Sequence, residues 1–289
     1  MLKPFFIAMN TNIEHLLQNL SEILSKFYDE REMTNIIRIY FHDKFQVSGP
    51  EILNLTEHSA KIFEKDIDRF RLNEPVQYIT GKAWFYKSMF SVDNSVLIPR
   101  PETEELVDLI IKTENRKEDL KILDIGTGSG CIALSLAIEM RKAEIEAIDI
   151  SNEALSIAEK NKKDLNVRNV SFIYNDFLNK SGWIQFGKFD IIVSNPPYIS
   201  YDEKELMSES TLKYEPELAL FPGDNDHLIF YRRIFEFATN HLNPGGTIYC
   251  ELNEFRSEEI KKIIPQNFCS GQILSDINGK DRILKVSLQ

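Results

Sequence analysis

The feature that most constrains the fold is an alternation of strand-like and helix-like segments that begins at Leu120. Short apolar runs predict strands, and the longer amphipathic segments between them predict helices. The expected strands are 120–125, 145–150, 170–174, 189–194, 247–252 and 281–287, and the expected helices are 130–141, 152–164, 226–242 and 255–264. This alternation is typical of a mostly parallel, doubly wound α/β sheet with helices on both faces.

The first 73 residues have a different pattern. Apolar side chains such as Ile13, Leu16 and Leu20 recur at helical spacing, and Gly49-Pro50 has the form of a helix start. No strand-like alternation interrupts this stretch, so a small all-helical domain is expected at 1–73. The domain could be a packing appendage or a module that recognises a partner.

The segment 74–98 joins these two parts. Its apolar runs 84–92 and 96–98 flank Asp93-Asn94, which predicts a β-hairpin with its turn at this pair. We therefore expect three parts: a helical domain at 1–73, a linker with a hairpin at 74–98, and the α/β domain at 99–289.

Composition narrows the classes of protein. The 289 residues can bury a large core, and no apolar run is long enough to span a membrane. We expect no secretory signal at Met1–Asn10 and a cytoplasmic location. Neither a disulfide framework nor a metal site is expected from Cys131, Cys250 and Cys269, which are far apart. The net charge of −11 argues against direct binding of nucleic acid.

A glycine-rich loop follows the first strand of the α/β part and leads into the helix at Cys131. Asp149 ends the next strand, at the spacing of a carboxylate that binds ribose hydroxyls. Asp176 and Phe177 close the third strand and could meet the edge and face of an adenine, or form a solvated turn. A dinucleotide site would need glycine at position 131, so the loop suits a nucleoside without a pyrophosphate, such as S-adenosylmethionine. The loop residues are Gly126, Thr127, Gly128, Ser129 and Gly130.

The turn Asn195-Pro196-Pro197-Tyr198 follows the expected strand 189–194. The prolines prevent a helix from continuing, so the carbonyls of Asn195 and Pro196 remain available to a ligand. An amide oxygen beside a free carbonyl can accept both hydrogens of a planar NH₂ group, against which Tyr198 can lie. The turn therefore predicts a receptor for an amide or an exocyclic amine, at the end of the strand where open α/β sheets bind ligands.

The order of loop, strand-end acid and turn resembles class I methyltransferases that alkylate planar nitrogens. Further phrases resemble the bacterial release factor glutamine methyltransferase family, from about residue 74 to the C-terminus. These phrases are 74–81, 96–104, 149–151, 215–220 and Asp281-Arg282. The family often has glycine shortly after the position of Glu251, where this chain has Leu252-Asn253-Glu254.

The resemblance implies a seven-stranded methyltransferase sheet preceded by a helical domain and a hairpin linker. It also implies a methyl transfer from S-adenosylmethionine to N5 of the glutamine in the Gly-Gly-Gln motif of class I peptide-chain release factors. By matched position, Asn195, Pro196, Pro197 and Tyr198 would hold the glutamine and be catalytic. The residues expected at the cofactor are Gly126, Thr127, Gly128, Ser129, Gly130, Asp149, Asp176, Phe177 and Asn195. A monomer whose partner is the release factor is expected.

Three alternatives remain open from the residues. A sister enzyme would methylate a glutamine in a ribosomal protein. An exocyclic-amine methyltransferase would act on nucleic acid, which the acidic composition disfavours. A non-catalytic adaptor would have no use for a paired amide receptor, so the turn argues against it.

Overall fold

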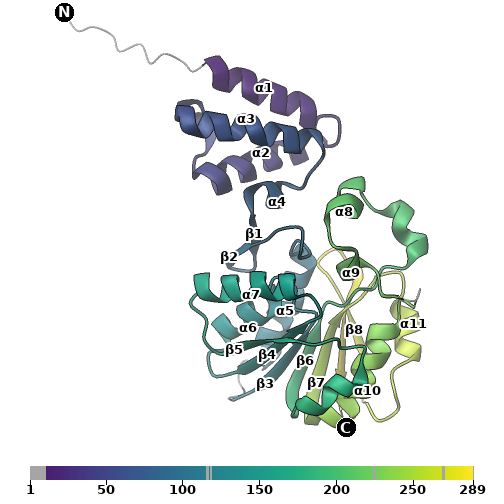
Figure 1. Ribbon diagram of the computed structural model, residues 1–289. Helices are drawn as coiled ribbons and strands as arrows, with labels where there is room; N and C mark the ends of the chain where they lie inside the picture. Colours follow the sequence, from purple (N-terminus) through teal and green to yellow (C-terminus); the bar gives the residue numbers. More distant parts are fainter. Residues whose placement is uncertain (1–10, 115–116, 118, 224–225, 269–270, 289) are drawn as a thin grey trace, which may run out of the picture. The chain divides into compact units, whose positions relative to one another are not determined.

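The computed structural model describes residues 11–114, 117, 119–223, 226–268 and 271–288 (Figure 1). Two compact units divide at Lys82/Ala83. The expectations for Met1–Asn10 and Cys269 fall outside the described residues. Within them, no helix combines the length and the apolar character that a membrane span requires.

The first unit is helical, as the sequence predicts. Its core is rich in aromatic side chains: Tyr40 packs edge-on against Phe41 and Phe70, and all three are buried. The Tyr40 hydroxyl donates to Asp66 at 2.9 Å, so the buried phenol has a partner. The elements are α1 (Thr11–Leu24), α2 (Glu30–Phe45), the 3₁₀ helix η1 (Gly49–Asn54), α3 (Glu57–Arg71) and α4 (Val76–Thr80).

A two-stranded hairpin follows, built from β1 (Lys82–Phe85) and β2 (Ser88–Ser91). The predicted hairpin exists, but the prediction of its turn at Asp93-Asn94 is wrong. The strands are joined by Tyr86-Lys87, where Tyr86 has a positive φ of 54°. Left-handed residues in two-residue turns match the twist of the flanking strands. Asp93 instead closes a separate turn, in which its carbonyl accepts from Val96 at 3.2 Å.

The second unit contains a seven-stranded sheet in the order β5-β4-β3-β6-β7-β9-β8. Neighbouring strands from β5 to β7 are parallel, and β9 is antiparallel to both of its neighbours. The expected fold class is therefore confirmed. The strands are β3 (Lys121–Ile125), β4 (Glu144–Asp149), β5 (Val170–Tyr174), β6 (Phe189–Ser194), β7 (Leu242–Glu251), β8 (Gln272–Ser275) and β9 (Asp281–Ser287).

Two strands differ from the expectation. β7 begins at Leu242 rather than at 247, because Leu242 pairs with Phe189 ahead of an irregularity that includes Gly245 at φ 74°. β8 was not predicted, because this short edge strand has exposed ends at Gln272 and Ser275 and therefore a weak apolar signal.

Alternate side chains of each strand enter different cores, which explains the buried, apolar strand sequences. Ile122, Ile145 and Ile191 belong to one core, with α5 and α6 residues. Leu123 and Ile192 belong to the other, with α10 residues. Figure 1 shows α5, α6 and α7 on one face of the sheet and α10 and α11 on the other. The helices are α5 (Pro101–Glu114), α6 (Cys131–Glu139), α7 (Asn152–Asp164), α10 (Ile229–His241) and α11 (Ser257–Lys262).

The functional candidates lie at the carboxyl ends of the parallel strands. The glycine loop follows β3, Asp149 ends β4, and Asn195 follows β6. Between β6 and α10, the helices among the described residues are short. These are η3 (Tyr201–Leu206), α8 (Glu209–Tyr214) and α9 (Glu217–Leu220), and the β5–β6 connection contains η2 (Lys180–Gln185).

Candidate functional site

The glycine loop is held by hydrogen bonds to the neighbouring strand. The amides of Gly126 and Thr127 both donate to the carbonyl of Ile148 at 2.9 Å. The Gly128 amide donates to Asp149 Oδ2 at 2.8 Å, and the Ser151 amide donates to Asp149 Oδ1 at 2.9 Å. Asp149 is therefore fixed by backbone groups on both sides, and each of its oxygens retains a lone pair for a ligand.

The absence of a Cβ atom has a different consequence at Gly128 and at Gly130. Gly128 has φ 54°, and a Cβ there would meet nothing within 4 Å, so a ligand can approach its backbone closely. At Gly130, with φ 79°, a Cβ would lie 3.0 Å from the Phe172 ring and 3.2 Å from the Ala158 side chain. Gly130 therefore permits the close packing of α6 against β5 and α7.

A buried acid, Asp124, is hydrogen-bonded to the glycine loop. Asp124 is fully buried and accepts from the Thr127 hydroxyl at 2.7 Å. Its other oxygen, Oδ1, has no partner among the described residues. Burial raises the pKa of this carboxyl to about 7. From the sequence, Asp124 is predicted only as part of a strand.

The end of β5 carries the expected pair Asp176 and Phe177. Asp176 accepts from the Leu178 amide at 3.1 Å and forms a tight turn. Phe177 is only 5% exposed, and its ring lies 5.5 Å from both the Trp183 and Phe237 rings. Most of the Phe177 ring therefore packs in the core, so little of it is left to face an adenine.

These elements surround a cavity of about 380 Å³, which we call the loop cavity. Nine of the sequence-predicted residues line it, whereas Gly130, Pro196 and Tyr198 do not. The nine are Gly126, Thr127, Gly128, Ser129, Asp149, Asp176, Phe177, Asn195 and Pro197. Backbone amides at one side and strand-end carboxylates at another match the polar groups of an S-adenosyl nucleoside.

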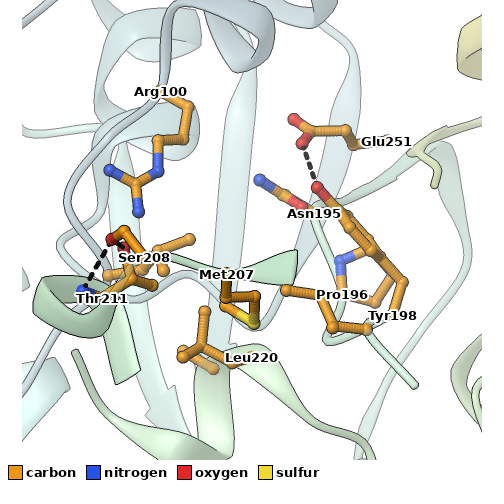
Figure 2. A pocket seen from close by; sticks show the side chains of 12 residues that line it. Arg100, Asn195, Pro196, Tyr198, Met207, Ser208, Thr211, Leu220 and Glu251 are labelled. Atoms are coloured by element: carbon orange, nitrogen blue, oxygen red, sulfur yellow. Dashed lines mark hydrogen bonds between the residues drawn. The ribbon is translucent and has the colours of Figure 1, made fainter. Parts of the chain in front are cut away.

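The Asn195 turn is held by side chains from distant elements. Asn195 Nδ2 donates to Thr103 Oγ1 at 3.1 Å, and Thr103 Oγ1 donates to Glu251 Oε2 at 2.6 Å. The Tyr198 hydroxyl donates to Glu251 Oε1 at 3.0 Å, a bond visible in Figure 2. Because Nδ2 is turned toward Thr103, Oδ1 is the end of the Asn195 amide that faces away from it.

Glu251 is the centre of this network. It ends β7 and is 2% exposed, and its carbonyl accepts from the Tyr231 hydroxyl at 2.9 Å. Burial raises the pKa of the Glu251 carboxyl, whereas the Thr103 and Tyr198 hydroxyls lower it. The chain continues past Glu251 with the Leu252 amide donating to the Arg282 carbonyl at 2.9 Å. The residues that replace the family's glycine thus leave the strand exit hydrogen-bonded to β9.

A second cavity of about 310 Å³, here the turn cavity, lies beside the Asn195 turn (Figure 2). Pro196 and Tyr198 line it with Glu251, and its apolar wall includes Met207 and Leu220. Four residues line both cavities: Leu97, Arg100, Asn195 and Ala219. The two cavities are therefore neighbours that share part of their walls, including Asn195.

An ion pair ties the segment before α5 to the β6–β7 connection. Arg100 Nη2 lies 2.5 Å from Glu215 Oε1, and Glu215 Oε2 accepts from the Ile98 amide at 3.2 Å. Glu215 is 6% exposed, so this carboxylate is buried with its partners. The sequence alone suggested no role for Thr103, Glu215 or Glu251. Thr103 and Glu215 stand in phrases of the family resemblance, and Glu251 precedes the departure from the family pattern, although none of the three has a local partner.

Comparison with known proteins gives a consistent result. A family model described as a methyltransferase domain matches residues 116–281. A release factor glutamine methyltransferase of Flavobacterium psychrophilum is 41% identical over 278 residues, covering 93% of this chain and 96% of the relative. A release factor glutamine methyltransferase of Bacteroides thetaiotaomicron is 43% identical over 282 residues, covering 96% of this chain and 99% of the relative.

Among solved structures, a 16S rRNA N2 G1207 methyltransferase of T. thermophilus, solved with AdoMet and guanosine, shares the fold. The match has a TM-score of 0.52 and 16% identity, and covers 72% of this chain and 50% of the other. This likeness extends to the architecture of the sheet and its helices.

Proposed function

Because the chain belongs to the release factor glutamine methyltransferase family, we propose that it methylates the side-chain N5 of the glutamine in the Gly-Gly-Gln motif of class I peptide-chain release factors. It is an S-adenosylmethionine-dependent methyltransferase by family. The observation that carries the proposal is that Asn195 lines both the loop cavity and the turn cavity. A donor and an acceptor bound in separate cavities would face each other there.

In this proposal the loop cavity holds S-adenosylmethionine, which supplies the methyl group. Asp149 accepts the ribose hydroxyls, and the backbone from Gly126 to Ser129 lies against the ligand. Asp176 and Phe177 border the adenine. The support for these roles is the position of all these residues on the cavity wall and the two backbone donors that hold Asp149 in place. Gly130 acts indirectly in this scheme, through the packing of α6.

The turn cavity holds the glutamine side chain. Met207 and Leu220 offer an apolar wall to its methylene groups. Asn195 Oδ1 and the Pro196 carbonyl accept the two N–H bonds of the amide, while Tyr198 flanks its plane and Pro197 keeps the turn rigid. A carboxamide nitrogen is a weak nucleophile because its lone pair is delocalised into the carbonyl. Two acceptors would orient this nitrogen and stabilise the positive charge that develops on it, so catalysis is mainly positioning and electrostatics.

The helical part, residues 1–73, we assign to recognition of the release factor. All the residues that line the two cavities come from Ser95 onward, which leaves the helical part without a share in the chemistry. Charge-reversal variants on its exposed faces should raise KM for a whole release factor and leave kcat unchanged. We further propose that the chain acts as a monomer in the cytoplasm; light scattering checks the first point and cell fractionation the second.

The proposal is tested with purified release factor and methyl-labelled S-adenosylmethionine. Peptide mass spectrometry should find one added methyl group on the motif glutamine. A release factor with that glutamine changed to asparagine is the matched control and should stay unlabelled.

Two parallel reactions use ribosomal proteins and total RNA as acceptors. Labelling of either, with an unlabelled release factor, would overturn the proposed substrate while leaving the methyltransferase chemistry intact.

A further inference from the structure

We propose that Thr103 and Glu251 are positioning residues that determine which end of the Asn195 amide faces the substrate. The inference rests on the proposed function and adds to it a reason why Asn195 presents oxygen rather than nitrogen. It is carried by a chain of three buried or half-buried groups, joined by hydrogen bonds of 3.1 Å and 2.6 Å.

The direction of each hydrogen bond follows from the chemistry of the last group. An ionised carboxylate can only accept hydrogen bonds, so Glu251 takes the single hydroxyl proton of Thr103. Thr103 Oγ1 then has only lone pairs left toward Asn195. It therefore accepts from Nδ2, and Oδ1 is turned away from it. With the network reversed, Nδ2 would face the substrate and repel the N–H groups of the glutamine.

The second oxygen of Glu251 controls the other end of the turn. It accepts the hydroxyl of Tyr198, whose side chain lines the turn cavity. Glu251 thus fixes the hydrogen-bond direction at Thr103 and the position of the Tyr198 ring at once. Both Thr103 and Glu251 are at most 2% exposed, so bulk water competes little for these bonds.

Charged and titratable groups surround Glu251. Arg282 of β9 favours its ionised form, whereas Glu102 of α5 opposes it. The phenols of Tyr198 and Tyr231 complete the surroundings, the first on the carboxylate and the second on the backbone carbonyl. Glu251 fixes the direction of these hydrogen bonds only when its carboxylate is ionised, so turnover should fall at low pH as Glu251 takes up a proton.

The decisive variant is Glu251→Gln. The Gln oxygen would still accept from Tyr198, so its NH₂ would donate to Thr103, and Thr103 would then donate to Asn195 Oδ1. The shape and the Tyr198 bond are kept, while the two bonds that link residue 251 to Thr103 and Thr103 to Asn195 are reversed. We expect kcat on the release factor to fall at least ~100-fold, the loss typical of a misplaced preorganised polar group. The dissociation constant for S-adenosylmethionine, measured by calorimetry, should stay within about threefold of the wild-type value. Such a change in binding free energy is smaller than the ~1.4 kcal/mol of a tenfold change.

A pair of Thr103 variants separates direction from packing. Thr103→Val keeps the shape but removes the hydroxyl, so Asn195 loses its orientation and kcat should fall roughly 10-fold, about the effect of one hydrogen bond. Thr103→Ser keeps the hydroxyl and should retain most of the wild-type kcat. Thr239→Val, in α10, removes a hydroxyl that donates to the Phe235 carbonyl and should leave kcat unchanged.

The outcomes separate this inference from the proposed function. If the wild-type protein does not methylate release factors, the proposed function fails first. If the wild-type protein does methylate release factors, a wild-type kcat in Glu251→Gln overturns the inference. An equally large fall in kcat in Thr103→Ser and Thr103→Val also overturns it. Should Glu251→Gln fail to fold, the Thr103 pair alone decides. The turnover of the wild-type protein should fall at low pH, and the residual turnover of Glu251→Gln should not. This difference would support the role of the carboxylate.

Discussion

The loop end and the turn end of the site are built in different ways. At the loop end, Asp149 is held by backbone amides of residues 21 and 2 positions away in the sequence. At the turn end, Asn195 binds a residue 92 positions away, and Tyr198 binds one 53 positions away. The hydrogen bonds at the loop end therefore come largely from backbone groups, and those at the turn end come from side chains.

This difference separates binding from catalysis. Backbone donors keep their places under most substitutions, so the loop end depends on a few glycines and one acid. A side-chain network can be weakened one group at a time, because each hydroxyl or carboxylate is a separate partner. Substitutions at the loop end should therefore change cofactor affinity, and substitutions at the turn end should change turnover.

The largest effect is expected for Asn195→Ala. Loss of the amide acceptor should lower turnover at least ~100-fold, since one preorganised polar contact is removed from the reacting group. Methylation of the release factor is measured together with cofactor affinity, which should fall less than turnover although Asn195 also lines the loop cavity. Asn243→Ala is the matched control, because Asn243 binds Asp190 at the opposite end of β6. Near-wild-type turnover in a folded Asn195→Ala protein would remove the distinction between the two ends.

Asp149→Ala tests the loop end. The carboxylate holds the loop and is expected to bind the ribose, so the dissociation constant for S-adenosylmethionine should rise at least ~10-fold. Glu146→Ala, on the same strand, is the control and should bind the cofactor normally. An unchanged calorimetric affinity in Asp149→Ala would contradict the assignment.

Asp124 gives a prediction of pH dependence. Burial raises its native pKa to about 7, whereas an unfolded Asp titrates near ~3.9. Between these values the native state binds more protons, so this group's contribution to stability falls as pH rises, by up to ~1.4 kcal/mol per pH unit. Asp124→Asn keeps an acceptor for Thr127 and cannot titrate. The free energies of unfolding of the two proteins, measured in urea at pH 5, 6 and 7, should therefore diverge; parallel curves would refute the prediction.

The smallest effect is expected for Tyr198→Phe. The ring that flanks the amide is kept, and only the hydroxyl on Glu251 is lost. Turnover should fall roughly 5-fold, about the value of one hydrogen bond. A loss as large as that of Asn195→Ala would show that the hydroxyl, rather than the ring, is the important part of Tyr198. Tyr174→Phe, exposed at the end of β5, is the control.

The α/β sheet, its strand sequences and the loop end were predictable from the chain alone. Their signals are local: the buried strands are mainly apolar, and glycines mark the turn before α6. The hairpin turn at Tyr86-Lys87 was not predictable in the same way, because Asp93-Asn94 is the stronger turn signal although it forms a separate turn. The short edge strand β8 was missed because half of its residues are exposed and its apolar signal is weak.

The sequence by itself determined the class of fold, the family and the residues of the loop and the turn, because each is a contiguous pattern with a local physical cause. Only the tertiary structure decided that Thr103, Asn195, Tyr198 and Glu251 form one network, and that Arg100 pairs with Glu215. These residues come from α5 and the segment before it, from the end of β7, and from the β6–β7 connection. Their meeting depends on how the parallel strands and their crossovers stack, and no spacing along the chain encodes that arrangement directly.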